Sequence, residues 1–324
     1  MRALIFLLLL TTAARAAKLL EIYFIDTEGG QATLVVSPSG QAMLIDTGYT
    51  GFGGRDATRI AEAAKNAHAK RINVLFLTHH HADHAGGVKN LLEVMPVESF
   101  YDHGPDVEHD NKYSDEYTKA MGSSPHTVYK PGDKIPIKDL DITVVVASHN
   151  HIETKGEPNP FCAGLAPKDG EKGENPQSGG VVVQYGKFRF ADLGDIEWNE
   201  ELALMCPENH VGKVDLLLTP HHGTDVPPKA DYALAPRVVV MNNGAHKGGK
   251  AEAYQTWSAM KGLEDLWQLH FAMAGGKDGN TADTFIANID EKCEGKYLKV
   301  TAREDGSFTV YNSRNKYTKT YGVK

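Results

Sequence analysis

The sequence predicts an α/β layered protein built as a single domain. Strand-like and helix-like segments alternate through both halves of the chain, ionisable residues follow several of the strand ends, and no stretch resembles a linker that would divide the molecule. Sites in α/β sheets form outside the ends of strands. The strand ends are therefore the places to look for function.

The first half contains short apolar runs that are typical of buried strands, with one helix-like segment rich in Ala, Arg, Lys and Glu. A glycine-rich loop, residues 49–54, precedes that helix. The predicted strands of this half are residues 20–25, 32–37, 42–46, 72–77 and 142–148. The predicted helices are residues 55–71, 88–95 and 115–121.

The second half repeats this outline after an irregular segment, residues 152–177, which is rich in Gly, Pro, Lys and Glu. A loop of that length is either disordered or functional, for example a lid, and both interpretations stay open. The predicted strands that follow are residues 180–185, 188–191, 214–219, 237–241, 267–271, 297–303 and 307–311. The predicted helices are residues 198–206 and 251–260.

The N-terminus predicts export. Residues 1–16 combine a basic start, a short apolar core and an Ala14-Arg15-Ala16 pattern, which is typical of a secretory signal peptide. The apolar run is too short to span about 30 Å of hydrocarbon. We expect cleavage after residue 16, a single domain over residues 17–324, a periplasmic or secreted location, and no membrane association after cleavage.

Charge and cysteine content narrow the function classes. The net charge of −8 argues against a strong nucleic-acid-binding surface. Three cysteines, Cys162, Cys206 and Cys293, allow at most one disulfide and one free thiol, and no Cys-x-x-Cys motif is present. The sequence does not predict a disulfide framework, and it leaves any pairing open.

The most informative segment is Thr78-His-His-His-Ala-Asp-His-Ala-Gly-Gly87, directly after the apolar run 72–77. Imidazole and carboxylate groups are the usual ligands of zinc and related divalent metals. His79 and His81 share one side of an extended segment, and Asp83 and His84 follow where the chain turns. The segment predicts a metal site with room for two ions, and two adjacent ions suit hydrolysis.

Three further strand ends carry ionisable residues: Asp46, Asp195 and the pair His221-His222. A carboxylate such as Asp195 can bridge two ions. Asp46 either completes an Asp-Thr-Gly turn or accepts the second N–H of a ligand imidazole. His246, in a loop after residues 237–241, is either a substrate-binding or proton-donating residue or a plain loop histidine.

These motifs resemble the metallo-β-lactamase superfamily. Residues 79–84 resemble its His-x-His-x-Asp-His signature, residues 44–48 its first motif, and residues 193–195 the motif of its bridging aspartate. The opening 25–31, Asn175 to Ser178 and residues 221–224 are similar to the ComEC-like branch, named after a DNA-uptake protein. The resemblance covers residues 20–311 in order.

The resemblance implies a four-layer αβ/βα sandwich, with the metals at the edge of its two sheets. It implies the ligands His79, His81, Asp83, His84 and Asp195, together with His221 or His222. We favour His221 because the last ligand of the superfamily often follows its strand directly. Asp46 is implied as a partner of a ligand, and His80 is expected to face solvent or a loop.

One motif departs from the family pattern. Many members place a separate histidine between the signature and the bridging aspartate. His149 and His151 have the right order for it, but they can instead cap the strand before the long loop. The ComEC-like branch often lacks this histidine, and Ser178 lies near its place. If nothing fills it, the first ion is held weakly and a mononuclear enzyme is an alternative.

These residues predict an exported metal-dependent hydrolase that uses a metal-activated water, with Asp83 orienting the water or accepting its proton. The branch implies a phosphodiester-like substrate. The alternatives are a β-lactamase or lactonase, and a non-catalytic metal- or ligand-binding module on the same fold. Two zinc ions are expected, and the sequence leaves manganese and iron open.

Overall fold

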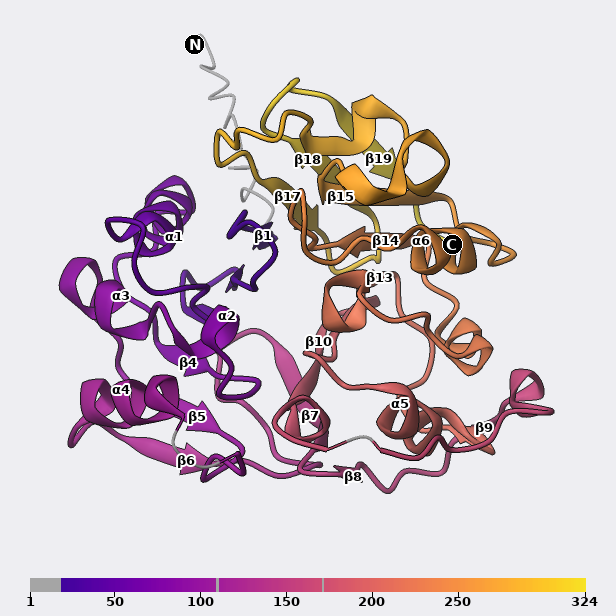
Figure 1. Cartoon of the computed structure of the whole chain (residues 1–324), viewed down its shortest axis with the longest axis horizontal. Coiled ribbons are helices and arrows are strands. Elements are labelled where there is room, and N and C mark those ends of the chain that lie inside the picture. The colour runs from indigo at the N-terminus through magenta and orange to yellow at the C-terminus, as the bar shows by residue number, and fades with distance from the viewer. Residues whose placement is uncertain (1–18, 109–110, 171) are drawn as a thin grey trace, which may run out of the picture.

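The computed structural model describes residues 19–108, 111–170 and 172–324. The predicted signal peptide lies outside the described residues. In the described part of the chain, no helix has both the length and the apolar character needed to cross a bilayer. Two large β-sheets face each other, and helices cover their outer sides (Figure 1).

Strands from both ends of the chain form the first sheet. Its strands are β1 (Leu20–Phe24), β2 (Thr33–Val36), β3 (Ala42–Ile45), β4 (Val74–Phe76), β5 (Phe100–Asp102), β6 (His126–Val128), β17 (Leu298–Ala302), β18 (Phe308–Asn312) and β19 (Thr318–Tyr321). Their order is β19-β18-β17-β1-β2-β3-β4-β5-β6. The predicted terminal hairpin is confirmed as β17 and β18, which extend the sheet by pairing Leu20 with Ala302.

The second sheet is formed by the middle and later parts of the chain. Its strands are β7 (Asp141–Ala147), β8 (Asn150–His151), β10 (Gly180–Tyr185), β11 (Phe188–Asp192), β13 (Leu216–Leu218), β14 (Val238–Met241), β15 (Asp265–His270) and β16 (Ile286–Asn288). Their order is β16-β15-β14-β13-β11-β10-β7-β8. A small separate sheet pairs β9 (Glu157–Pro158) with β12 (Glu208–Asn209).

Helices form the two outer layers. The α-helices are α1 (Arg55–Asn66), α2 (Ala82–Ala85), α3 (Val88–Val94), α4 (Lys112–Met121), α5 (Trp198–Met205) and α6 (Ala251–Ser258). Short 3₁₀ turns are η1 (Pro160–Cys162), η2 (Asn175–Gln177), η3 (Pro220–Gly223), η4 (Lys229–Leu234), η5 (Met273–Gly275), η6 (Lys277–Gly279) and η7 (Asp283–Phe285). Helices α1, α3 and α4 lie on one side of the molecule, and α5 and α6 lie on the other (Figure 1).

Side-chain alternation along the strands builds three buried layers. In β1, Ile22 and Phe24 point into the core between the two sheets, whereas Tyr23 points to the core beneath α1 and α3. In β10, Val183 faces the central core and Val182 faces the core beneath α5 and α6. The strands are buried on both faces, which explains their nearly continuous apolar sequences.

The parallel strands bring the predicted site residues to one edge. Strands β3, β4 and β5 run parallel, as do β11, β13 and β14, so the loops after them emerge on the same side of each sheet. The two sets of loops touch: Gly179 N donates to Thr78 O at 2.9 Å, and His221 N donates to Gly194 O at 3.1 Å. The site therefore lies where the carboxyl ends of both sheets meet.

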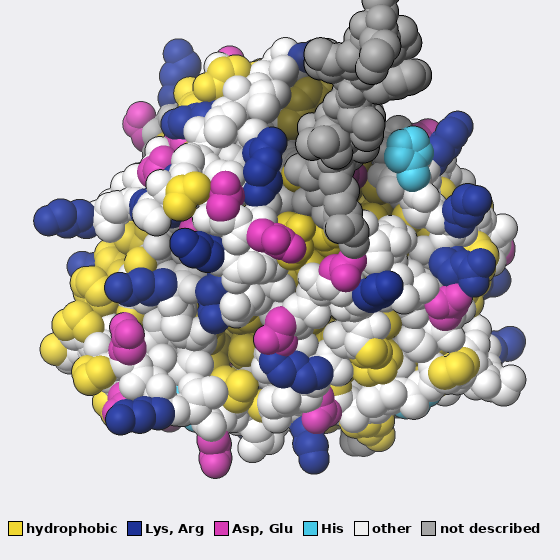
Figure 2. All heavy atoms as spheres, turned by 180° about the vertical axis from the view of Figure 1, so that it is seen from behind, with side chains coloured by type: hydrophobic (Ala, Val, Ile, Leu, Met, Phe, Trp, Pro, Cys, Tyr) yellow, Lys and Arg dark blue, Asp and Glu magenta, His cyan; other side chains and the backbone are white. Residues whose placement is uncertain are grey.

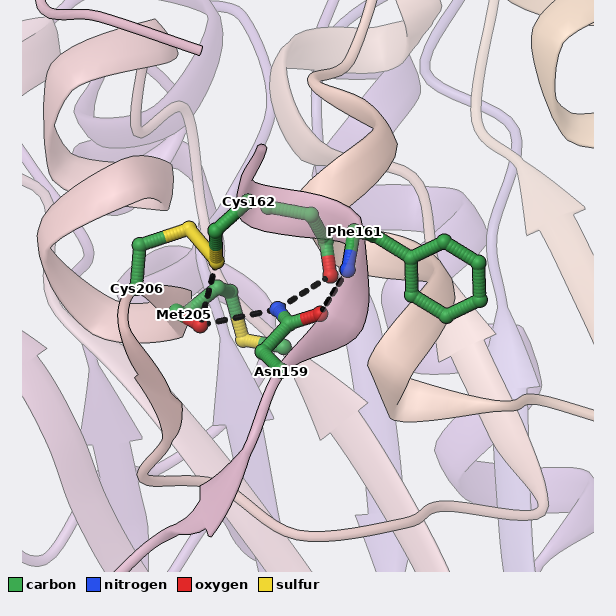
Figure 3. Close-up of a disulfide and its surroundings, with 6 residues drawn as sticks. Asn159, Phe161, Cys162, Met205 and Cys206 are labelled. Carbon is green, nitrogen blue, oxygen red and sulfur yellow. Dashed lines mark hydrogen bonds between the residues drawn. A yellow bond between two sulfur atoms is a disulfide. The ribbon is translucent and has the colours of Figure 1, made fainter. Parts of the chain in front are cut away.

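The segment 152–177 is tied to the rest of the protein rather than free. Cys162 and Cys206 form a disulfide (Figure 3). Beside it, Asn159 Nδ2 donates to Met205 O at 2.8 Å, and Asn159 Oδ1 accepts from Phe161 N at 3.0 Å. The segment is therefore a loop held in place by these contacts, and its end reaches the site. Glu171 is outside the described residues.

The disulfide is expected to contribute substantially to stability. Replacing both Cys162 and Cys206 by alanine should lower the free energy of unfolding by about 2–4 kcal/mol, since a bridge over 44 residues constrains the unfolded chain. Denaturant unfolding of the oxidised and the reduced protein measures this. The double variant serves as the control because it should not respond to reductant. Identical unfolding midpoints for the oxidised and reduced wild type would contradict the prediction.

Candidate metal centre

Four buried side chains from three separate segments meet at the shared edge of the sheets. Asp83 and His84 lie on α2, Asp195 follows β11, and His222 lies in η3. We call these four residues the tetrad. His84 Nε2 lies 3.2 Å from His222 Nε2, 3.3 Å from Asp83 Oδ2 and 3.2 Å from Asp195 Oδ2. His222 Nε2 lies 3.2 Å from each of the same two carboxylate oxygens.

The tetrad has the spacing of a tetrahedral metal site. An ion with bonds of about 2.0–2.1 Å places its ligand atoms about 3.3–3.4 Å apart. Five of the six separations within the tetrad are 3.2–3.3 Å, and the sixth is below 4.8 Å. Asp195 Oδ1 is buried without a hydrogen-bond partner. Two carboxylates and two imidazoles arranged in this way fit a divalent cation.

Asp46 fixes the orientation of His84. Its Oδ2 lies 2.6 Å from His84 Nδ1 and accepts from Thr78 Oγ1 at 2.7 Å, while its Oδ1 accepts from Thr78 N at 2.7 Å. The proton on Nδ1 leaves Nε2 to face the tetrad. The structure therefore places Asp46, with its side chain fully buried, as the partner of the His84 imidazole.

Without a cation, the carboxylates hold a proton on His84. Burial alone would lower the pKa of His84, but Asp195, Asp83 and Asp46 raise it well above 6.5. This charge stabilises the metal-free protein below a pH of about 6.5. Because the pKa of His84 is higher in the folded state than in the unfolded chain, this stabilisation is lost as the pH rises through the raised folded-state pKa.

Zinc binding to the tetrad should release about one proton per ion near neutral pH, because His84 must give up its proton to become a ligand. Affinity should then increase about tenfold per pH unit up to the raised pKa of His84. Titration calorimetry in buffers of different ionisation enthalpy measures the released proton. A dissociation constant that is the same at about pH 6 and about pH 8 would contradict this expectation.

His79 and His81 form a second, smaller group beside the tetrad. His79 Nε2 lies 3.0 Å from His81 Nδ1, and His79 Nδ1 lies 3.0 Å from Thr78 Oγ1. Burial, followed by the positive charge of His84, holds the pKa of His79 well below 6.5. A neutral imidazole is the form that binds a metal. His81 is partly exposed, and its Nε2 lies 3.2 Å from Glu108 Oε1.

His149 and His151, the two candidates for the third motif, have partners outside the tetrad. His149 Nδ1 pairs with Glu200 at 2.9 Å, and the ring of His151 stacks on His210. His149 directly precedes β8 and His151 lies within it, at the edge of the second sheet. Ser178 lies near the site instead, fully buried, with its Oγ accepting from Asp195 N at 3.2 Å. Ser178 thus positions the backbone of Asp195.

The structure selects His222, not the favoured His221, for the tetrad. Both residues have positive φ, 47° and 55°, and this tight kink directs consecutive side chains to different places. His222 turns inward and is fully buried. The Nε2 of His221 lies 3.8 Å from Asp195 Oδ2, and its Nδ1 lies 2.5 Å from Asp225 Oδ2. The preference for His221 is therefore corrected.

His246 lies outside the centre, and its neighbour Lys247 takes part in it. The side chain of His246 is exposed, and its Nε2 pairs with Glu291 at 2.7 Å. Lys247 points the other way and forms an ion pair with Asp83 Oδ2. The prediction of a catalytic role for His246 is thus not supported by its position. In this loop the side chain that contacts the tetrad is that of Lys247.

His80 was expected to face either solvent or a loop, and in the structure it faces a loop. It is buried, and its Nε2 lies 3.0 Å from Gly104 O. Its backbone N–H donates at 2.9 Å to Glu174, which also pairs with His103 at 2.9 Å. Although burial opposes ionisation, these contacts lower the pKa of Glu174 to about 2. This network anchors the end of the long loop beneath the histidine segment.

Two amides lie near the centre: Asn175 belongs to a motif named in the sequence analysis, whereas Asn242 was not singled out there. Asn242, directly after β14, contacts His222 Nδ1 through its Nδ2 at 3.1 Å. Asn175 Nδ2 contacts His221 Nε2 at 3.3 Å and donates to Glu197 at 3.0 Å. Asn242 occupies a strand end like the other site residues, so the same rule applied to β14 would have found it.

Comparison with known proteins agrees with this architecture. Residues 25–159 match the model of the metallo-beta-lactamase superfamily. The chain is 31% identical to a hydroxyacylglutathione hydrolase of Xylella fastidiosa (strain 9a5c) over 133 residues. This aligned stretch makes up 40% of this chain and 42% of that protein. The chain is also 26% identical to an atrochrysone carboxyl ACP thioesterase of Aspergillus fumigatus over 107 residues. This second stretch makes up 32% of this chain and 33% of that protein.

A solved structure is similar over a longer stretch. The metallo-beta-lactamase fold protein YhfI of Bacillus subtilis aligns with 86% of this chain and 98% of its own, at 13% identity and a TM-score of 0.46. The chain spans less than half the length of the curated relatives it matches.

Residues 25–159 are therefore similar to the metallo-β-lactamase superfamily. The two facing sheets with outer helices confirm the predicted fold class. The matched region contains Asp46 and the segment from His79 to His84. Asp195 and His222 lie beyond it, so their part in the centre rests on the geometry of the tetrad.

Proposed function

We propose that this protein is a metal-dependent hydrolase in which the tetrad holds one divalent ion, zinc. The near-tetrahedral spacing of Asp83, His84, Asp195 and His222 carries the proposal. Two imidazoles and two carboxylates at such distances suit zinc. His79 and His81 would hold a second ion more weakly, and the unpartnered carboxylate oxygen Asp195 Oδ1 would be available as a further ligand.

Each residue then has a definite task. A bound divalent ion polarises the bond under attack and lowers the pKa of a water molecule. Asp83 accepts the proton of the attacking water at its carboxylate, Asp46 keeps the Nδ1 proton on His84, and Ser178 holds the backbone of Asp195. Asn242 Nδ2 lies 3.1 Å from His222 Nδ1 and so restricts the orientation of that ring.

The proposed substrate is a small phosphodiester-like anion. The similarity of the opening motif and of residues 221–224 to the ComEC-like branch supports it. A further support is Lys247, whose ammonium group lies against Asp83 and offers a positive charge at the centre. Figure 2 shows Lys and Arg side chains interspersed with Asp and Glu on the face seen there. That face lacks the uniformly basic surface that is typical of nucleic-acid-binding proteins.

The proposal includes export. The leader-like residues 1–16 support it, and so does the disulfide between Cys162 and Cys206, since disulfides persist in oxidising compartments. Fractionation of cells that express the full chain, followed by mass measurement of the recovered protein, tests this proposal. Recovery from the periplasm or medium with residues 1–16 removed is expected, and an uncleaved protein in the cytoplasm would contradict it.

A substrate panel tests the hydrolase assignment. The metal-free and zinc-loaded proteins are assayed in parallel with bis(p-nitrophenyl) phosphate, nitrocefin, a lactone and a thioester. The thioester is included because one relative is a thioesterase. The expected result is zinc-dependent turnover that is fastest with the phosphodiester. Faster turnover of nitrocefin or the lactone would favour a β-lactamase or lactonase. Zinc binding without turnover of any substrate would favour a binding module.

A further inference from the structure

An aromatic loop lies beside the tetrad, with one ring half-buried and the other exposed. It comprises residues 49–54 between β3 and α1 and carries Tyr49 and Phe52. The side chain of Phe52 is 70% exposed, although burial of such a ring is favourable by about 1.5–3 kcal/mol. Its φ is 47°, an unusual conformation for an aromatic residue. Exposure and backbone strain at the same residue indicate that the ring is retained for a reason other than folding.

The exposed ring is nevertheless held in place. The guanidinium of Arg55 lies 4.5 Å from the centroid of Phe52. Arg55 itself is fixed by ion pairs with Glu28 at 2.8 Å and Asp56 at 2.6 Å, and it donates to Thr27 O at 3.2 Å. A ring held by an anchored cation loses little freedom when it binds a ligand.

A continuous row of side chains connects this ring to the tetrad. The rings of Phe52 and Tyr49 meet edge to face with their centroids 6.4 Å apart. Lys247 Nζ lies 5.7 Å from the centroid of Tyr49 and pairs with Asp83. The order from the centre outward is therefore a carboxylate of the tetrad, an ammonium group and two aromatic rings.

From this row we propose a specificity subsite, made of Lys247, Tyr49 and Phe52, for a substrate whose anionic reacting group carries an aromatic or flat apolar substituent. Lys247 pairs with the anion, and the two rings contact the substituent that the reaction leaves attached. The inference rests on the proposed hydrolase function because it concerns the same centre. It adds a substituent class that the motifs do not specify.

Two phosphodiesters with the same leaving group test the subsite. Bis(p-nitrophenyl) phosphate retains an aromatic group after hydrolysis, and methyl p-nitrophenyl phosphate retains a methyl group. The ratio of their kcat/KM values should favour the aromatic diester in the wild type and fall about threefold to tenfold in Phe52→Ala. Phe161→Ala is the matched control, since Phe161 is an exposed ring near the disulfide, away from the centre. Its ratio should equal that of the wild type.

The role of Lys247 in the subsite is tested by removing its positive charge. Lys247→Met should raise KM for both diesters about tenfold, because the ammonium contacts the group that they share. Lys213→Met removes an exposed lysine elsewhere and should leave both KM values unchanged. An unaltered ratio in Phe52→Ala, or unaltered KM values in Lys247→Met, would overturn the subsite.

A binding measurement separates failure of the subsite from failure of the proposed function. Calorimetry of the zinc-loaded protein gives dissociation constants for phenylphosphonate and methylphosphonate. Tighter binding of phenylphosphonate that is lost in Phe52→Ala supports the subsite even if neither diester is hydrolysed. Turnover of both diesters, with equal binding of the two phosphonates in the wild type and in Phe52→Ala, would leave the function standing and remove the subsite.

Discussion

Replacing His222 by alanine is expected to reduce kcat/KM on the order of 10³-fold. The reason is that His222 Nε2 lies 3.2 Å from the two carboxylate oxygens with which it would share an ion. Charge stabilisation by a metal is worth several kcal/mol, and each 1.36 kcal/mol is a factor of ten in rate. The measurement is steady-state kinetics with the best substrate of the panel, at saturating zinc.

The matched control is the neighbouring histidine. His221→Ala removes a ring that pairs with Asp225 and stays 3.8 Å from Asp195 Oδ2, so kcat/KM should fall by about tenfold or less, comparable to the loss of one hydrogen bond. A larger loss in His221→Ala than in His222→Ala would contradict the assignment of the tetrad.

Replacing Asp46 by asparagine should weaken zinc binding about 10–100-fold, although Asp46 is not in the tetrad. The amide group cannot accept from Thr78 N and Thr78 Oγ1 and also from His84 Nδ1 in the same geometry. Nε2 of His84 would then lose its fixed orientation toward the ion. Competition with a chromophoric chelator gives the dissociation constant.

A structural effect of Asp46→Asn must be separated from this loss of affinity. Circular dichroism and the unfolding midpoint of the metal-free protein monitor the fold, while the chelator assay monitors the ion. Asp56→Asn is a suitable comparison because Asp56 is also a buried carboxylate, bound to Arg55 and Tyr49 N rather than to a ligand. An unchanged zinc affinity in Asp46→Asn would refute the positioning role.

The tetrad could be predicted from the sequence only where local spacing determines geometry. Asp83 and His84 are adjacent on one short turn after a buried strand, so their convergence follows from local structure. Asp195 was found because it also follows a strand, and parallel strands bring such ends to one edge of the sheet. The α/β class followed from the alternation of strands and helices, whereas the four-layer sandwich was implied by the family resemblance.

The choices between neighbouring residues could not be made from the sequence. His221 and His222 differ by one position, and the kink that turns the second inward depends on contacts with the rest of the fold. Lys247 and His246 present the same problem in another loop, where Gly248 and Gly249 both have positive φ and set the direction of the chain.

Contacts between residues that are far apart in the sequence could not be predicted from the sequence either. Nothing local relates Cys162 to Cys206, because their contact depends on how the loop 152–177 packs against α5 and η4. The pairing of the terminal hairpin with β1 is of the same kind, since hydrophobic alternation shows which face of a strand is buried but not which strand lies beside it.

The metal stoichiometry of the wild type, His222→Ala and His81→Ala tests the central claim most directly. After dialysis against a buffer with a weak chelator, elemental analysis should find about one zinc per chain in the wild type and in His81→Ala, because the tetrad remains complete in both. His222→Ala should retain almost none. If His222→Ala retained the ion and His81→Ala lost it, the tightly bound metal would belong to His79 and His81, and the account given for the tetrad would be wrong.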